Sequence, residues 1–142
     1  MIYSNEHHES ILKLEDLYVD EQSFTRHGNA EPGDIAMQFS LEMTEEVNNS
    51  RRIRLGVFGT QDNKYTFKIR IVGVFTVESS ITLDDVYKEN MYKVNAVAIL
   101  FPYLRTQLSL LTTQPGMSPV LIQPMNIVEM FRGVEAKSEM CE

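Results

Sequence analysis

The residues of this chain that could do chemistry are few and poorly placed for it. The run Glu6-His7-His8-Glu9 contains metal-ligand types, but adjacent residues cannot converge on one ion as an i, i+4 pair on a helix can. His27 lies in a loop without a Ser or Cys nucleophile in any recognisable motif, so we interpret it as solvated. Cys141, the single cysteine, has no second thiol for a disulfide or a metal clip. The residues therefore predict no enzyme and no metal or other cofactor.

The basic cluster Arg51-Arg52-Ile53-Arg54 is the one candidate for binding an anion. In a strand, Arg52 and Arg54 would share the polar face, where they would be solvated or paired with Glu42, Glu45 or Glu46. The whole chain carries a net charge of −7, from 20 acidic and 13 basic residues. This balance argues against a nucleic-acid partner, which needs a concentrated positive face, and favours encounter with basic partners.

Length and composition predict a single domain. A chain of 142 residues that is 43% hydrophobic can bury one core, and we expect that core over residues 12–131, with loosely ordered termini at 1–11 and 132–142. No apolar run approaches the roughly 18–20 residues that cross a bilayer, and the first residues do not resemble a signal peptide. These features predict a cytoplasmic protein.

The first half of the chain has the alternation typical of strands. Polar and apolar residues alternate over Ile35–Met43, Arg51–Gly59 and Lys64–Val77, and short turns separate these segments. They predict an antiparallel meander, and a looser alternation over Leu12–Phe24 predicts a first strand that completes a sheet of four. Gly73 interrupts the third alternation, which indicates a bulge or a close approach of the backbone to a neighbour.

The second half is dominated by a helix that we predict over Val94–Thr113. Ala96 through Leu104 contains no polar side chain beyond one tyrosine hydroxyl, so no face of this segment is left for water. Pro102 predicts a kink or a helix start near Ile99. A single sheet covers only one side of such a helix, so the sequence predicts that the chain is one subunit of an oligomer.

Shorter elements flank this helix. Thr82 resembles the cap of a short helix or irregular stretch before it. Gln114–Met125 contains three prolines with apolar residues between them and predicts an extended crossing segment. Asn126 and Glu129 have capping-box spacing and predict a last short helix over 126–131. The fold class is therefore α+β: a four-stranded antiparallel sheet with one long and one short C-terminal helix.

The apolar strand face, the eight methionines and the proline-spaced segment leave two interpretations open. They could form an adaptable surface that binds apolar polymer, or they could all belong to the core.

Several short motifs carry a family resemblance: Leu17-Tyr18, Ser23-Phe24, Gly73-Val74-Phe75, Ile99-Leu100-Phe101-Pro102-Tyr103-Leu104-Arg105, and Pro119-Val120-Leu121-Ile122-Gln123-Pro124-Met125-Asn126. In this order and spacing they resemble the SecB family of export chaperones, from about Leu12 to Phe131. The resemblance implies a tetramer built from two dimers, with the long helices between the sheets. It also implies binding of unfolded polypeptides, typically export precursors, without nucleotide.

The resemblance implies three sets of functional residues. A client groove would contain Met37, Phe39, Leu41, Val120, Ile122, Met125, Ile127, Met130 and Phe131. The oligomer interface would contain Ile99, Phe101, Tyr103, Leu104, Leu108 and Leu111. Asp20 and Glu21 would preserve part of the acidic face that docks the motor SecA, whereas Thr25 and Lys68 stand where acids are expected. An offshoot of the family protects an antitoxin, and such a dedicated client would tolerate loss of the motor site.

Two other hypotheses stay open on the sequence. The chain could be a small-molecule-binding or enzymatic α+β domain whose apolar strand face encloses a pocket, or a scaffold subunit without a client.

Overall fold

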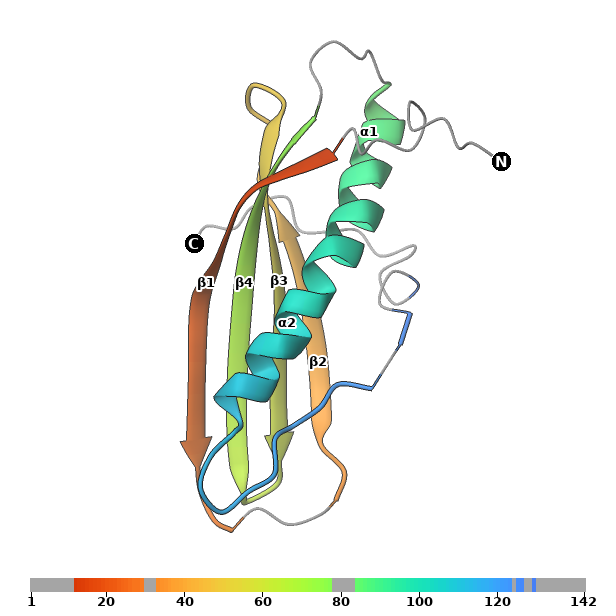
Figure 1. Ribbon diagram of the computed structural model, residues 1–142. Coiled ribbons are helices and arrows are strands. Elements are labelled where there is room, and N and C mark those ends of the chain that lie inside the picture. The colour runs from red at the N-terminus through yellow and green to blue at the C-terminus, as the bar shows by residue number, and fades with distance from the viewer. Residues whose placement is uncertain (1–11, 30–32, 78–83, 124, 127–128, 130–142) are drawn as a thin grey trace, which may run out of the picture.

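The computed structural model describes residues 12–29, 33–77, 84–123, 125–126 and 129. Four strands are followed by one helical stretch (Figure 1). The elements are β1 (Leu12–Arg26), β2 (Ala36–Met43), β3 (Ser50–Gln61), β4 (Tyr65–Val77), α1 (Asp85–Met91), the π-helical turn η2 (Tyr92–Ala96) and α2 (Val97–Leu111). The predicted α+β class is confirmed.

The strands form one antiparallel sheet in the order β1-β4-β3-β2, so the predicted meander with a returning first strand is confirmed. Asn48 and Asn49 form the turn before β3 with φ angles of 54° and 61°. Asn63 forms the next turn with φ of 60°. Asparagine tolerates this left-handed conformation better than most residues, which explains why the polar turn signals in the sequence were reliable.

The irregularities of the sheet lie on β1, not at Gly73. The register between β1 and β4 shifts between Leu14 and Asp16 and again between Val19 and Glu21, whereas Gly73 pairs regularly with Ile53 of β3. The prediction of a close approach at Gly73 is confirmed. An added Cβ would lie 2.8 Å from Leu100 of α2 and 2.6 Å from the Phe75 ring. The helix therefore sits directly on the backbone of β4.

The helical part differs from the prediction in its boundaries. Asp84, not Thr82, is the cap: its carboxylate accepts a 2.8 Å hydrogen bond from the Tyr87 N–H, while Thr82 lies outside the described residues. Because α1, η2 and α2 follow without a break, the predicted start near Ile99 is wrong. Pro102 is inside α2, and the irregular hydrogen bonding lies upstream, in η2.

Together these elements make one stretch, Val86–Leu111, that is long and apolar enough to cross a membrane by length and composition alone. The expectation that no segment reaches that length is thereby corrected. About a third of its most apolar window is buried inside the subunit. The core helix of a globular domain meets the same criterion, and this helix packs on the sheet.

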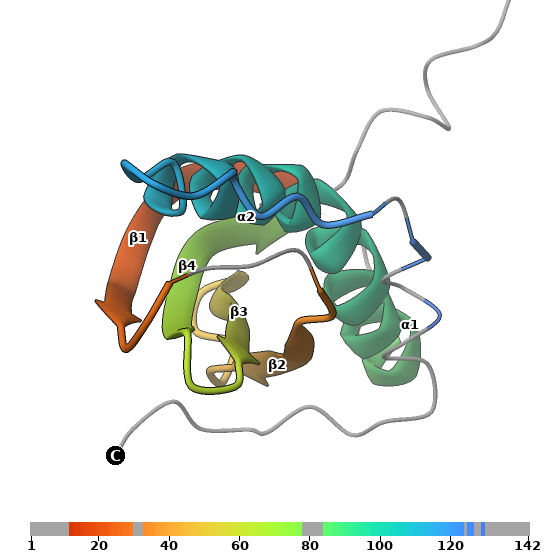
Figure 2. The ribbon, with the colours of Figure 1, turned by 90° about the horizontal axis from the view of Figure 1, so that it is seen from below.

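The core lies between the helix and one face of the sheet, as the view along the layers shows (Figure 2). Alternate residues of β4 and β3 point into it, among them Phe67, Ile69, Phe75, Ile53 and Leu55. From α2 the buried side chains are Val97, Leu100, Phe101, Leu104 and Leu108, spaced as one face of a helix. In the described part of the chain no helix covers the other face of the sheet.

After α2 the chain crosses the sheet on the helix side (Figures 1 and 2), as an extended segment like the one predicted. Two contacts fix its start. Arg26 at the end of β1 donates hydrogen bonds to the carbonyls of Pro115 and Gly116 at 3.0 and 3.1 Å. The buried Thr112 hydroxyl accepts a 2.7 Å bond from the Val120 N–H.

The short final helix cannot be compared in full, because 127–128 and 130–142 lie outside the described residues. The Asn126 side chain does accept a 3.0 Å hydrogen bond from the Glu129 N–H, which is the capping contact that the spacing predicted.

Candidate functional site

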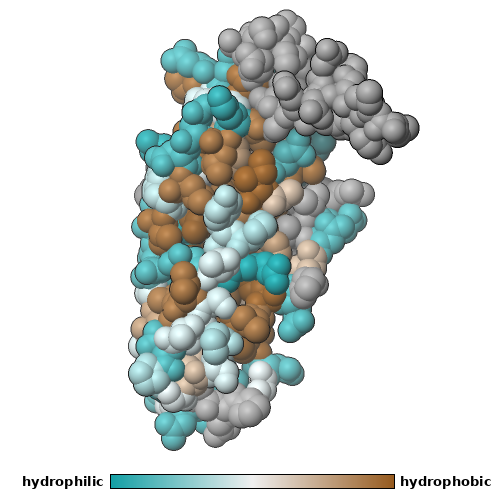
Figure 3. Space-filling model, in the orientation of Figure 1, coloured by the Kyte–Doolittle hydropathy of each residue, from teal (hydrophilic) through white to brown (hydrophobic). Residues whose placement is uncertain are grey.

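A groove runs between α2 and the crossing segment. Its volume is about 440 Å³, and it is lined by Pro102, Arg105, Thr106, Ser109, Leu121 and Ile122. Figure 3, which views the helix side of the molecule, shows apolar side chains gathered along the helix and beside it. The groove therefore combines an apolar wall with one cation.

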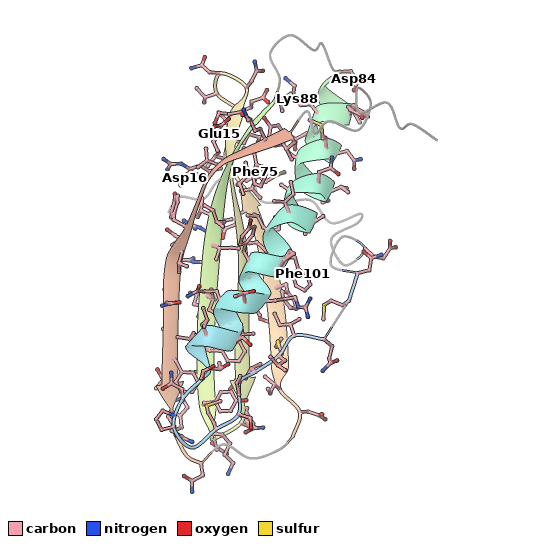
Figure 4. The ribbon with its side chains drawn as sticks, viewed as in Figure 1. Glu15, Asp16, Phe75, Asp84, Lys88 and Phe101 are labelled. Carbon is pink, nitrogen blue, oxygen red and sulfur yellow. The ribbon has the colours of Figure 1, made fainter. Side chains whose placement is uncertain are left out.

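Aromatic rings connect the rim of this groove to the edge of the sheet. The Arg105 guanidinium lies 5.9 Å from the centroid of the Phe101 ring, and that ring meets Phe39 of β2 edge-on at 6.2 Å between centroids. Phe101 projects from α2 toward β2 (Figure 4). A cation over an aromatic face is attracted by the ring, so Phe101 helps to hold the Arg105 side chain in place.

The structure divides the predicted groove residues into three sets. Met37 and Phe39 are half-buried at the sheet edge, and Met125 is exposed. Leu41, Val120 and Ile122 are buried within the subunit and offer little free surface, although Ile122 lines the groove. Ile127, Met130 and Phe131 lie outside the described residues.

Leu121 was not among the predicted groove residues, although it is 65% exposed and lines the groove. A signal for it was present in the sequence. In an extended segment, neighbouring side chains point to opposite sides, so inward-facing residues at positions 120 and 122 place the side chain of position 121 outward.

The predicted interface residues lie on different sides of α2. Leu104 and Leu108 are fully buried against the sheet and Phe101 nearly so, which leaves these three side chains little surface for a second subunit. Tyr103 is 48% exposed, and Ile99 and Leu111 are half-buried. Leu110, which was not predicted, is 63% exposed. The surface of α2 that a second subunit could cover is thus the Tyr103 and Leu110 side.

Asp20 and Glu21, the candidate motor-docking acids, are engaged by cations of the same subunit. On the outer sheet face, the Asp20 carboxylate lies 2.9 Å from Arg54 Nη2 and 3.8 Å from Arg70 Nε. Glu21 pairs with Arg70 and lies 3.6 Å from Lys68 Nζ. Thr25 is exposed on the same strand. These acids are held inside an ion-pair network.

The second β1 bulge explains how two consecutive acids reach one face. Residues alternate between faces in a regular strand, but Asp20 is an extra residue between Val19 and Glu21 in the pairing with β4. Arg54 also lies 3.7 Å from Glu42, as the strand pattern suggested. Three acids thus face three cations, namely Arg54, Lys68 and Arg70, and their formal charges cancel.

A second polar cluster joins the start of the helix to the β2–β3 connection. Arg51 is buried, donates a 2.7 Å hydrogen bond to the Thr44 carbonyl and pairs with Glu89. The buried Tyr92 hydroxyl donates a 2.7 Å bond to Glu46, which also accepts from Lys88 at 3.1 Å (Lys88 is labelled in Figure 4). The sequence interpretation named Arg51 as part of a basic cluster and gave it no inward partner, so this role was missed.

The environment of this cluster shifts two pKa values in opposite directions. Burial alone would raise the pKa of Glu46, but the hydrogen bonds from Tyr92 and Lys88 and the charges of Lys88 and Arg51 together lower it. Burial raises the pKa of Tyr92, and its bond to the Glu46 carboxylate raises it further. Both shifts favour the arrangement of a charged carboxylate and a protonated phenol.

This arrangement predicts a pH-dependent stability. Because the Glu46 pKa is lower in the folded than in the unfolded chain, its contribution is present above the ordinary value of 4.5 and is lost as the pH falls through the folded value. We expect Glu46→Gln to cost about 1 kcal/mol at pH 7, and the difference from wild type to shrink as the pH falls below 4.5. Denaturant unfolding between pH 7 and 3.5 measures this difference in unfolding free energy. Glu45→Gln, at the exposed neighbouring residue, is the control. A difference that stays constant with pH would contradict the assignment.

The part of the chain that the structure describes contains no cluster of His, Cys, Asp and Glu that could hold a metal ion. His27 is exposed, as interpreted, whereas Glu6–Glu9 and Cys141 lie outside the described residues.

A family model described as preprotein translocase subunit SecB matches residues 5–138. The Mycobacterium tuberculosis SecB-like chaperone Rv1957, solved in complex with a ChAD peptide from the antitoxin HigA1, aligns with a TM-score of 0.67 and 13% identity over 80% of this chain and 90% of that chain. A Streptococcus agalactiae protein of unknown function aligns with a TM-score of 0.47 and 10% identity, over 79% of this chain and 96% of that chain.

Among curated sequences, the uncharacterised protein MJ0357 of Methanocaldococcus jannaschii is 38% identical over 47 residues. That match spans 33% of this chain and only 30% of the relative. The family model covers nearly the whole chain, and the SecB-like chaperone has the same fold. The chain therefore belongs to the SecB family, whose chaperone role is the broad class of function that this membership supports.

Proposed function

We propose that this protein is a cytoplasmic, nucleotide-independent holdase, a homotetramer arranged as a dimer of dimers that keeps client polypeptides unfolded. The observation that carries the proposal is the groove between α2 and the crossing segment, whose exposed Leu121 and apolar neighbours offer contacts without a sequence code. Such a chaperone acts by mass action on the unfolded state, so it requires no enzymatic site.

The proposed oligomer follows from the outward side of α2. Tyr103 and Leu110 are large apolar side chains that the subunit leaves exposed, and only about a third of the most apolar window of the helix is buried. A second subunit would remove this surface from water, which is the main driving force for association.

The charge of the protein supports a proposal for the kind of client that it binds. Four subunits with a net charge of −7 each would carry −28, a field that attracts basic segments of export precursors. On the outer sheet face, however, Asp20 and Glu21 are already neutralised by Arg54, Lys68 and Arg70. This pairing disfavours docking of SecA and favours a dedicated client, such as an antitoxin, over general export.

The small-molecule alternative has less support, because the apolar faces of β3 and β4 pack against α2. A bound ligand in the purified protein, without protection of unfolded clients, would favour that alternative.

The test is suppression of aggregation. The purified protein, at an expected mass of about 65 kDa from four 16.3 kDa subunits, should prevent light scattering by a model protein diluted from guanidine, with no nucleotide added. Leu121→Asp should weaken client binding about tenfold, the loss expected for one buried leucine contact. Val86→Asp, at an exposed residue at the other end of the helix, is the control.

A 16.3 kDa monomer without protection would refute the proposal. The polypeptides that co-purify from the native host then decide between the variants: export precursors, one antitoxin, or none.

A further inference from the structure

The groove contains a cation without a carboxylate partner in the described part of the chain. Arg105 is half-buried, lines the groove and stacks on Phe101, and none of the ion pairs of the described residues includes it. By contrast, Arg51 and Arg54 both have acidic partners. A partly desolvated guanidinium next to an apolar wall is a binding feature of the groove, not a solvated surface charge.

We propose that Arg105 makes the groove select polypeptide segments in which a carboxylate, from Asp, Glu or a chain terminus, stands beside a large aliphatic side chain. This inference rests on the proposed holdase function and adds a chemical preference to it. The carboxylate would pair with Arg105, and the aliphatic side chain would lie against Leu121 and Ile122.

The geometry supports a pair that is stronger than an exposed one. The position of the guanidinium over the Phe101 ring restricts it, and its planar fork of donors matches the two oxygens of a carboxylate. Partial burial reduces the competition from water. The neighbouring Thr106 hydroxyl does not compete, because it donates a 3.1 Å hydrogen bond to the Pro102 carbonyl of its own helix.

The net charge of the chain opposes this preference only at long range. At physiological ionic strength, charges on the surface are screened over about 8 Å, whereas an ion pair in contact within a groove is screened much less. An acidic protein can therefore attract basic segments by its overall field and still prefer a carboxylate at this one position.

The experiment uses two labelled nine-residue peptides that differ only in having Glu or Gln next to a central Leu-Leu pair. Their binding to the wild-type oligomer is measured by fluorescence anisotropy. Wild type should bind the Glu peptide about fivefold more tightly than the Gln peptide. Arg105→Gln should remove that difference without weakening the Gln peptide, and Arg105→Lys should keep part of it. Arg52→Gln, which removes one exposed positive charge of the outer sheet face, is the control and should retain the full difference.

The outcomes are distinguishable. Equal binding of both peptides to wild type would overturn this inference and leave the holdase function standing, whereas no binding of either peptide would remove both. A change of oligomer mass in Arg105→Gln would overturn it as well, because the groove would then be covered by a second copy.

Discussion

The Leu104→Ala variant is expected to lower the free energy of unfolding of the subunit by about 3–4 kcal/mol. Leu104 is fully buried in the layer between α2 and the sheet. Removing three carbon atoms there loses their transfer free energy and leaves a cavity that a helix seated on Gly73 cannot close by moving inward. Denaturant unfolding followed by circular dichroism, at several protein concentrations, measures the loss.

Leu110→Ala is the matched control, because it makes the same chemical change on the same helix at a side chain that is 63% exposed. It should change the unfolding free energy of the subunit little and instead weaken the oligomer, which sedimentation detects. Concentration dependence separates the two effects, because only association depends on protein concentration. If Leu104→Ala dissociated a subunit of unchanged stability, Leu104 would be an interface residue after all.

This pair of variants also shows where the sequence was insufficient. The helix is apolar on nearly every side, so its periodicity did not reveal which face meets the sheet. That choice depends on contacts far apart in the chain, such as Leu100 against Gly73 and Arg51 stacked 5.1 Å from the Tyr92 ring. The composition of the helix predicted that a second surface must cover it. It did not predict which residues of the helix that surface contacts.

The strands could be predicted more closely, because one face of the sheet carries charges and the other is buried. All four predicted strands therefore begin and end within two residues of the observed bounds. The first strand was less regular, and its two bulges are the physical reason. Whether Asp20 meets Arg54 or Arg70 depends on the pairing of three strands, which no local pattern contains.

Arg51 is a different case, because a usable signal was present. The buried positions of β3 include Ile53, Leu55 and Val57, so the alternation also places Arg51 on the inner side. An inward arginine needs a partner, and Glu46, Glu89 and Tyr92 were candidates within reach of the fold. The sequence interpretation assigned Arg52 and Arg54 to the polar face and did not extend the same alternation to Arg51.

The Gly59→Ala variant is expected to lower stability by about 3 kcal/mol, although replacing a glycine inside a strand ordinarily strengthens the strand. The Phe67 ring of β4 lies across Gly59 of β3, and an added Cβ would be 2.1 Å from Phe67 Cζ and 2.7 Å from both Cε atoms. Because Phe67 is fully buried, its ring has no free space to move into. Gly33→Ala, whose Cβ would lie 3.5 Å from Gln61, should be nearly neutral.

Replacing Phe67 by a smaller side chain tests the cause of this loss of stability. Phe67→Leu alone should cost about 1–2 kcal/mol, because it leaves a small cavity. In the double variant, the new methyl group partly fills that cavity, so its cost should be close to that of Phe67→Leu and well below the sum of the two single changes. A coupling of about 2 kcal/mol would assign the effect to this contact. Strict additivity would contradict it, since a loss of backbone origin would be the same with either side chain at position 67.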